Sequence, residues 1–230
     1  YEEISLLRQS IHEEPECAFE EFKTAEKVMR FLDKYGIEYA SGIAKTGIVA
    51  TIHGKKPGKT VLLRADMDAL PMSENPNNPF ASKVDGKMHA CGHDGHTAGL
   101  CLSAAVLNEM KENLSGTVKF MFQPAEEAEG GAYPMIQAGA LEGVDGAFGA
   151  HLWGSMPEGI VSIKYGAMMA APDNFKITVK GVGGHGSAPQ LAIDPVLIAS
   201  QIVVSLQTIV SRKVSPLESC VVTVGKIHGG

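Results

Sequence analysis

Apolar positions recur along this chain with more than one spacing, and each spacing predicts a different kind of element. Between residues 19 and 35 they recur at every third or fourth position, as on the buried face of a helix: Phe22, Ala25, Val28, Met29 and Leu32. Residues 60–65 are apolar throughout their middle, which is typical of a strand covered on both faces. Similar patterns predict helices over 1–11, 93–113 and a short stretch ending near 138, and strands over 47–52, 117–122 and 146–151. Alternating strands and helices indicate an α/β layer fold.

A second domain is predicted after a shift in composition near Pro172. It comprises an alternating strand, a Gly-rich loop leading into a helix, and a further strand, over 175–179, 194–212 and 220–224. We therefore expect a first domain over 1–171 and the start of a second over 172–230, which amounts to half of a small sheet.

The 230 residues include 20 basic and 26 acidic side chains, so the formal charge is −6. That balance argues against a nucleic-acid partner, because such proteins concentrate positive charge. The 44% hydrophobic share is that of an ordinary globular protein. No apolar run of about 18 residues predicts a membrane span, and the acidic start of the chain lacks the basic flank of a signal peptide. Four scattered cysteines fit free thiols, so we expect a cytoplasmic protein without a membrane partner.

Pairs of carboxylates follow two of the predicted strands. Asp66 and Asp68 come directly after one buried strand, and Glu126 and Glu127 come shortly after the next. Ligands of α/β sheets bind beyond the carboxyl ends of strands, so these acids are candidates for metal or proton chemistry. One of two adjacent glutamates can bind a metal while the other accepts a proton from a neighbouring water. Taken alone, each pair also fits a simpler role, as a loop-start cap or a solvated acidic turn.

The densest group of metal-ligating residue types lies in residues 88–97. This stretch holds three imidazoles, a thiol and a carboxylate, and Cys91 and His93 flank a glycine that permits a tight loop. Thiolate and imidazole are both good ligands for zinc and similar metals. Asp94 and His96 fit supporting roles, in which they cap the following helix or orient the ligands.

His151 closes an apolar strand beside the only tryptophan. A lone histidine in that position is more often structural, but the other strand-end groups make it a candidate ligand. Together the sequence predicts four metal ligands and two acids in catalytic or supporting roles: Cys91, His93, Glu127 and His151, with Glu126 and Asp68. Mixed sulfur, nitrogen and oxygen donors suit Zn²⁺, Mn²⁺ or Co²⁺, and hydrolysis by an activated water is the reaction that follows.

Five segments, in this order, resemble motifs of the zinc aminoacylase/carboxypeptidase family of metallopeptidases. The segments are IHEEPE at 11–16, RADMDALP at 64–71, HACGHDGHT at 89–97, QPAEE at 123–127 and GGHGSAP at 183–189. The most similar branch contains hippurate hydrolase, the auxin–amino acid conjugate hydrolases and N-acetyldiaminopimelate deacetylase.

The resemblance implies a site for two divalent ions, of zinc, manganese, cobalt or nickel. The residues that match the family's ligands are Cys91, His93, Glu127 and His151. The resemblance also implies that Glu126 is the base that activates water, that Asp68 is an acidic partner holding the site in its working geometry, and that His185 stabilises the tetrahedral intermediate. Family substrates are N-acyl or N-aroyl amino acids and small peptides, cleaved at the amide.

The same resemblance implies a mixed sheet flanked by helices, with a smaller α+β lid domain of ferredoxin-like form. Only part of that lid is present, and in relatives the lid carries a homodimer contact. Gln190 stands where the family usually has a further histidine. Family members also continue well past the position of Gly230 and supply a last histidine ligand from there.

Three interpretations therefore stay open at this point. The first is a metal-dependent amidohydrolase of which this chain is a part. The second is a truncated, non-catalytic relative that binds a metal or a partner. The third is a hydrolase in which the Cys91 thiol is the nucleophile; this last one leaves Glu126, Glu127 and the two aspartates without a role.

Overall fold

The computed structural model describes residues 1–128 and 130–230. The chain divides into two compact units, Tyr1–Ile160 and Val161–Gly230, which are described separately below. The domain boundary at 171/172 that the composition suggests stays a prediction.

The first unit contains a sheet, helices and one short 3-10 turn, much as the apolar pattern predicts. Its elements are α1 (Glu2–Glu13), α2 (Phe22–Lys34), β1 (Glu38–Ile43), β2 (Gly47–His53), β3 (Lys56–Asp66), α3 (His93–Glu109), η1 (Lys111–Asn113), β4 (Ser115–Gln123), α4 (Ala132–Gln137) and β5 (Gly146–Gly149). The strand expected over 146–151 ends at Gly149, so His151 lies beyond the strand rather than within it.

The five strands form one mixed sheet in the order β1-β2-β4-β3-β5. β3 runs parallel to both of its neighbours, β4 and β5, while β2 runs antiparallel to β4 and to β1. The carboxyl ends of the three parallel strands therefore meet at one edge of the sheet, where loops can bring side chains together. The expected mixed sheet flanked by helices is confirmed.

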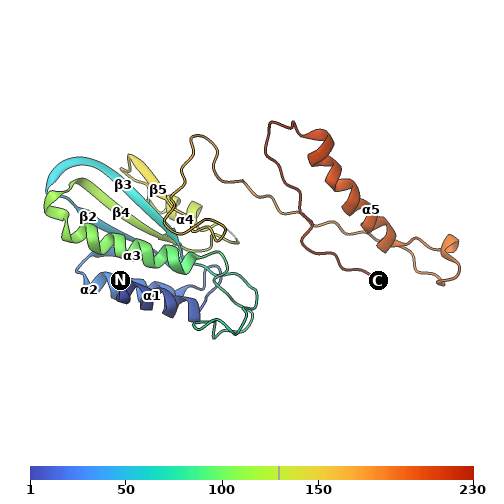
Figure 1. Ribbon diagram of the computed structural model, residues 1–230, viewed down its shortest axis with the longest axis horizontal. Helices are drawn as coiled ribbons and strands as arrows, with labels where there is room; N and C mark the ends of the chain where they lie inside the picture. The colour runs from blue at the N-terminus through green and yellow to red at the C-terminus, as the bar shows by residue number, and fades with distance from the viewer. Residues whose placement is uncertain (129) are drawn as a thin grey trace. The chain divides into compact units, whose positions relative to one another are not determined.

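Alternation along the strands sends side chains into two cores. Phe120 and Phe122 of β4 are fully buried among α2 and α3, which cover one face of the sheet (Figure 1). Met121, which lies between them, points to the other face and packs with Leu62 of β3 and Met135 of α4. This two-residue alternation fixes the register between β3 and β4. It thereby fixes where the loops after these two strands begin at the edge of the sheet.

In the second unit, α5 (Pro195–Thr208) is the main element, and it continues as a π-helical turn, η3 (Ile209–Lys213). Asp194 caps α5, because its side chain accepts hydrogen bonds from the amides of Val196 and Leu197. A short 3-10 turn, η2 (Pro189–Leu191), precedes it. Residues 195–213 are long and apolar enough to cross a membrane on length and composition alone, which is also true of core helices in proteins that do not span one.

The strands expected over 175–179 and 220–224 are a wrong prediction, because neither segment forms a strand. A strand is held by the backbone ladder to its neighbour, and alternation supplies only the face that it buries. Within the described part of the second unit, the one β-bridge joins Val182 to Ile193. The lid is therefore present only in part, without its sheet.

Candidate metal centre

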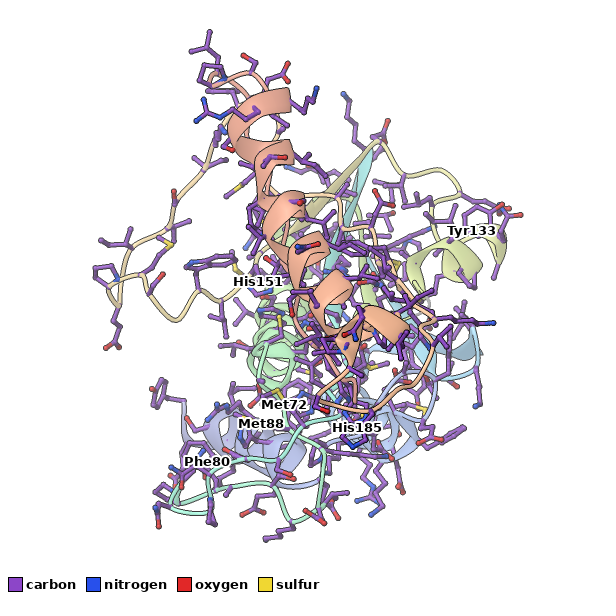
Figure 2. All side chains as sticks on the ribbon, turned by 90° about the vertical axis from the view of Figure 1, so that its right-hand side faces the viewer. Met72, Phe80, Met88, Tyr133, His151 and His185 are labelled. Carbon is purple, nitrogen blue, oxygen red and sulfur yellow. The ribbon has the colours of Figure 1, made fainter. Side chains whose placement is uncertain are left out.

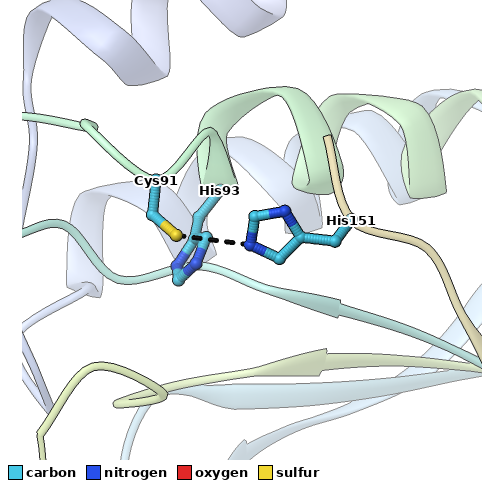
Figure 3. A group of neighbouring side chains, drawn as sticks. All are labelled: Cys91, His93 and His151. Atoms are coloured by element: carbon cyan, nitrogen blue, oxygen red, sulfur yellow. Dashed lines mark hydrogen bonds between the residues drawn. The ribbon is translucent and has the colours of Figure 1, made fainter. Parts of the chain in front are cut away.

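Cys91, His93 and His151 converge at the carboxyl edge of the sheet (Figure 3). Cys91 and His93 stand at the start of α3, and His151 comes from the segment after β5. The Cys91 Sγ lies 3.3 Å from the His151 Nε2, and one donor atom from each of the three residues lies within 4.8 Å of the others. Gly92 between them adopts φ 88°, so the tight loop uses the left-handed conformation that glycine permits.

His93 is buried and has one nitrogen without a hydrogen-bond partner among the described residues. Its Nδ1 lies 3.3 Å from the Asp68 Oδ1, so that nitrogen donates a hydrogen bond to the carboxylate. The other nitrogen, Nε2, is orphaned and lies 3.7 Å from the Glu127 Oε1 and 4.0 Å from the Glu126 Oε2. An imidazole held by a carboxylate on one side, with a free lone pair on the other, is the arrangement that metal ligands adopt.

The charges around His93 favour a cation. Burial opposes its protonation, but the hydrogen bond to Asp68 and the nearby Asp66 carboxylate outweigh burial and raise the pKa of His93. His93, Glu126 and Glu127 together form a second group whose donor atoms lie within 4.8 Å. In a site of this charge a divalent ion would take the place of the proton.

Glu126 and Glu127 are exposed to different extents. The side chain of Glu126 is 43% exposed and that of Glu127 is 22% exposed. The Glu127 amide donates to the Asp68 Oδ2 at 2.8 Å, so Asp68 joins the loop after β4 to His93. Adjacent glutamates thus differ in position, with Glu127 nearer to the imidazole and Glu126 nearer to solvent.

The Cys91 thiol is held in its protonated form by its surroundings. Burial and the neighbouring Glu127 carboxylate raise the pKa of Cys91 to about 12. A thiol of that pKa is a poor nucleophile at neutral pH, because the thiolate is the reactive form. A bound cation reverses this preference, since metal-ligating thiols are deprotonated.

Asp66, predicted as a candidate for metal or proton chemistry, and His96, predicted in a supporting role, form a buried pair. The His96 Nδ1 lies 2.6 Å from the Asp66 Oδ1, and the His96 Nε2 accepts a hydrogen bond from the Leu152 amide at 2.8 Å. Burial opposes ionisation of Asp66, but His96, His93 and Arg64 outweigh it and lower the pKa of Asp66 to about 2. Because both nitrogens of His96 are engaged, it positions the segment that carries His151.

A second polar network lies behind the start of α3. His12 of α1 bridges two buried carboxylates, with Nδ1 2.8 Å from Asp94 and Nε2 3.0 Å from Glu74. Arg8 also reaches Asp94, at 2.6 Å. Phe80, from the loop after β3, lies beside α1 (Figure 2), and the Arg8 guanidinium carbon is 4.6 Å from its ring centroid. This network fixes the residue next to His93 without reaching the ligands themselves.

Two further histidines of the motifs stand apart from the donor groups. His89 is 4% exposed and neither of its nitrogens has a partner among the described residues; burial lowers its pKa to about 4. His185 lies in the second unit, where its Nδ1 accepts a hydrogen bond from the Ser187 hydroxyl at 2.8 Å. The role of His185 stays a prediction.

The residues present fit the metal ions that the motifs imply. The predicted ligands Cys91, His93 and His151 lie together in one group, and Glu127 joins His93 in another. The Nε2 of the buried His93 imidazole has no partner among the described residues, and this is an unfavourable feature that a cation would relieve. Sulfur, nitrogen and oxygen donors of this kind suit Zn²⁺, Mn²⁺ or Co²⁺ better than Ca²⁺ or Mg²⁺.

Several curated proteins are similar to this chain over nearly all of its length. N-acetylcysteine deacetylase of Bacillus subtilis (strain 168) is 45% identical over 225 residues, which cover 97% of this chain and 59% of that protein. N-acyl-L-amino acid amidohydrolase of Geobacillus stearothermophilus is 46% identical over 229 residues, covering 99% of this chain and 62% of that protein. The chain thus spans about three fifths of the length of these relatives.

Solved structures agree with this relationship. A putative aminohydrolase from methicillin-resistant Staphylococcus aureus superposes with a TM-score of 0.76 at 40% identity, covering 97% of this chain and 60% of that chain. The YXEP protein of Bacillus subtilis, a dinuclear metal binding peptidase from the M20 family, gives a TM-score of 0.66 at 46% identity, covering 68% of this chain and 44% of that chain.

The family model for peptidase family M20/M25/M40 matches residues 62–224. This stretch includes all four predicted ligands and reaches into the second unit. The resemblance drawn from the motifs is confirmed: the chain belongs to peptidase family M20/M25/M40.

Proposed function

We propose that this chain carries the metal-binding part of an amidohydrolase that cleaves N-acyl amino acids or small peptides with an activated water. The observation that carries the proposal is the buried His93 imidazole. Asp68 holds one of its nitrogens, and the other nitrogen, which has no partner in the described part of the chain, faces Glu127 and Glu126. The His93 nitrogen would bind the metal, and a neighbouring glutamate would accept the proton from water.

Two divalent ions would be held by Cys91, His93, Glu127 and His151. Such ions supply a water whose pKa is lowered to about 7 and polarise the amide carbonyl. Asp68 keeps the His93 Nδ1 protonated, so that the Nε2 lone pair is free for a ligand role. The relative described as dinuclear metal binding supports two ions rather than one.

Glu126 is the residue proposed to move protons. Its carboxylate is the more exposed of the pair and lies 4.0 Å from the His93 Nε2, which leaves it free to face a water and a substrate. It would accept a proton from the attacking water and return that proton to the amine that leaves. Balanced in this way, the reaction yields a carboxylic acid and a free amino acid.

The substrate class is proposed from the relatives, whose names give N-acetylcysteine and N-acyl-L-amino acids as substrates. His185 is proposed to stabilise the oxyanion of the tetrahedral intermediate, in a homodimer formed through the lid. We further propose a cytoplasmic enzyme with zinc, manganese, cobalt or nickel as its metal. The raised pKa of Cys91 argues against the thiol hydrolase, because its thiolate is disfavoured by the neighbouring carboxylate.

The test is a Glu126→Gln variant of the metal-loaded protein, assayed on N-acetyl-L-methionine and hippurate. Loss of a general base lowers kcat by about 100-fold or more, while the metal content measured by mass spectrometry stays at the wild-type level. Glu38→Gln is the matched control, since it neutralises an exposed glutamate on β1 far from this edge; its kcat stays within about twofold. Wild-type turnover in Glu126→Gln would remove the base from the proposal, and a metal-loaded wild type that hydrolyses neither substrate would favour the non-catalytic relative.

A further inference from the structure

Glu21, at the start of α2, is a fully buried carboxylate that no step above uses. Its exposed fraction is 0%. Its Oε1 accepts hydrogen bonds from the Phe19 amide at 3.0 Å and from the Ala125 amide at 2.9 Å. Its Oε2 accepts from the Thr46 hydroxyl at 2.6 Å. Burial of a carboxylate is costly, so three donors gathered on one side chain call for an explanation.

The two amides that share the Glu21 Oε1 belong to residues in an unusual backbone conformation. Phe19 has φ 58° and Ala125 has φ 52°. For residues with a side chain, the left-handed region is unfavourable and persists only where surrounding contacts impose it. The same oxygen therefore holds both strained peptides in place.

Ala125 immediately precedes the two glutamates of the candidate metal centre, and its peptide groups are pinned on both sides. Its amide is bound by Glu21, and its carbonyl accepts hydrogen bonds from the Gly130 and Gly131 amides, both at 3.0 Å. Gly131 has no room for a side chain, because a Cβ there would lie 2.0 Å from the Pro124 oxygen. The conformation of Ala125 sets the directions in which Glu126 and Glu127 leave the end of β4.

We infer that Glu21 is a positioning residue for the glutamate pair, acting through the Ala125 backbone. The inference rests on the proposed function for the roles of Glu126 and Glu127. Glu21 reaches the loop from a residue 104 positions earlier in the chain, and it ties the start of α2 to the end of β4. Among the described residues, its side-chain hydrogen bonds reach Phe19, Thr46 and Ala125 and none of the proposed metal ligands.

Glu16 offers a matched control within the same part of the chain. Its Oε1 accepts from the Lys23 amide at 3.2 Å, and its Oε2 accepts from the Thr24 amide at 2.9 Å and from the Thr24 hydroxyl at 3.1 Å. Like Glu21, it therefore binds two backbone amides and one threonine hydroxyl. Its side chain caps α2 and makes no hydrogen bond to the described part of the glutamate loop. Removing it destabilises the same helix without releasing Ala125.

The first measurement is hydrogen exchange of the loop amides in Glu21→Ala and Glu16→Ala. We expect exchange at Ala125 and Gly131 to rise at least tenfold in Glu21→Ala and to stay within about twofold in Glu16→Ala. Equal protection of the loop in the two variants would overturn the inference. This readout needs no activity, so it separates failure of the inference from failure of the proposed function.

The second measurement is steady-state kinetics on the metal-loaded protein. We expect kcat to fall at least tenfold in Glu21→Ala with KM within about threefold, and to stay within about twofold in Glu16→Ala. Glu21→Gln keeps the Oε1 acceptor for both amides, and it should retain kcat within about threefold. If Glu21→Ala does not fold, Thr46→Val, which removes one of the three donors, takes its place with an expected drop of about threefold.

A backbone rescue gives the sharpest discrimination. Glycine adopts a positive φ without the penalty that alanine has, so Ala125→Gly should restore kcat about fivefold in the Glu21→Ala background. The same substitution should not improve the Glu16→Ala variant. A double variant no better than Glu21→Ala, together with unchanged loop exchange, would show that Glu21 is only a structural residue.

Discussion

Two histidine networks lie on either side of the start of α3, and they differ in one respect. Behind the helix, His12 engages both of its nitrogens with the carboxylates of Asp94 and Glu74. At the sheet edge, His93 engages one nitrogen with Asp68, and its other nitrogen is buried without a partner among the residues that the structure describes. A buried polar atom without a partner is costly, so it is retained where something else binds it. The difference supports the proposal that His93 is a ligand, whereas His12 has a structural role.

The other histidines near this edge need a second criterion, which is membership of a group of donor atoms. His96 uses both nitrogens, for Asp66 and for the Leu152 amide, and in this respect it resembles His12. His151 also has a partner at each nitrogen, the Cys91 sulfur at 3.3 Å and the Leu152 carbonyl at 2.5 Å, and it is proposed as a ligand because it lies in one donor group with Cys91 and His93. His89 has two buried nitrogens without a partner among the described residues, but it belongs to none of the donor groups found there. An unpartnered nitrogen and a place in a donor group occur together at His93.

The largest effect expected is on metal affinity in His93→Ala. Loss of a residue that only hydrogen-bonds a ligand weakens metal binding by up to roughly 100-fold. Loss of His93, which is proposed to bind the metal itself, should weaken it by more. Isothermal titration with Mn²⁺ or Zn²⁺ measures it, with thermal unfolding of the metal-free proteins as the control for folding. Metal affinity equal to wild type would break the comparison.

Asp68→Asn should have the next largest effect. The neutral asparagine side chain favours a proton on the His93 Nδ1 less strongly than the Asp68 carboxylate does, so the Nε2 lone pair is less available. Metal affinity should therefore fall by about 10- to 100-fold. The same titration measures it. An unchanged affinity would mean that Asp68 acts elsewhere than through His93.

Metal affinity should also depend on pH. Burial and the Glu127 carboxylate raise the pKa of Cys91 to about 12, so its proton must leave when a cation binds the sulfur. Protons then compete with the metal, and affinity rises about tenfold per pH unit between pH 6 and 8 from Cys91 alone. The apparent affinity at several pH values gives the slope, and Cys91→Ala should lower that slope by about one. A slope that Cys91→Ala leaves unchanged would exclude the thiolate as a ligand.

The smallest effect on the metal is expected from His12→Gln, which should change affinity by less than about threefold. Its effect is on stability, because glutamine cannot serve both buried carboxylates, and the free energy of unfolding should fall by about 1–3 kcal/mol. The hydrogen bond to Asp94 raises the pKa of His12 above 6.5 despite burial. The difference from wild type in urea unfolding should therefore be full below pH 6.5 and shrink as pH rises through the folded pKa. A large loss of metal affinity in His12→Gln would show that the His12 network supports the metal site, which contradicts the comparison.

The elements of the first unit follow from local periodicity, but their ends and partners do not. β1 was not predicted, because Glu38–Ile43 is mostly exposed and gains its strand form by pairing with β2. The segments 175–179 and 220–224 show the converse, since they alternate well and yet form no strand in the described second unit. A strand forms only when a neighbouring segment supplies the hydrogen-bonding partner, so the pattern within one segment does not by itself predict it.

The site divides in the same way. The types of the ligands and their clustering at strand ends can be read from short motifs such as 89–97. The supporting contacts join distant positions: His96 to Asp66, and Glu21 to Ala125 across 104 residues. These contacts depend on how the sheet and helices pack, so a single sequence offered no means of pairing them.

The most direct test of the central claim is anomalous diffraction from crystals of the protein loaded with Zn²⁺, recorded on both sides of the zinc absorption edge. The account predicts an anomalous peak about 2.0–2.1 Å from the His93 Nε2, with the Cys91 sulfur or the Glu127 carboxylate as a further ligand. A peak beside His12 and His89, with none at His93, would contradict it.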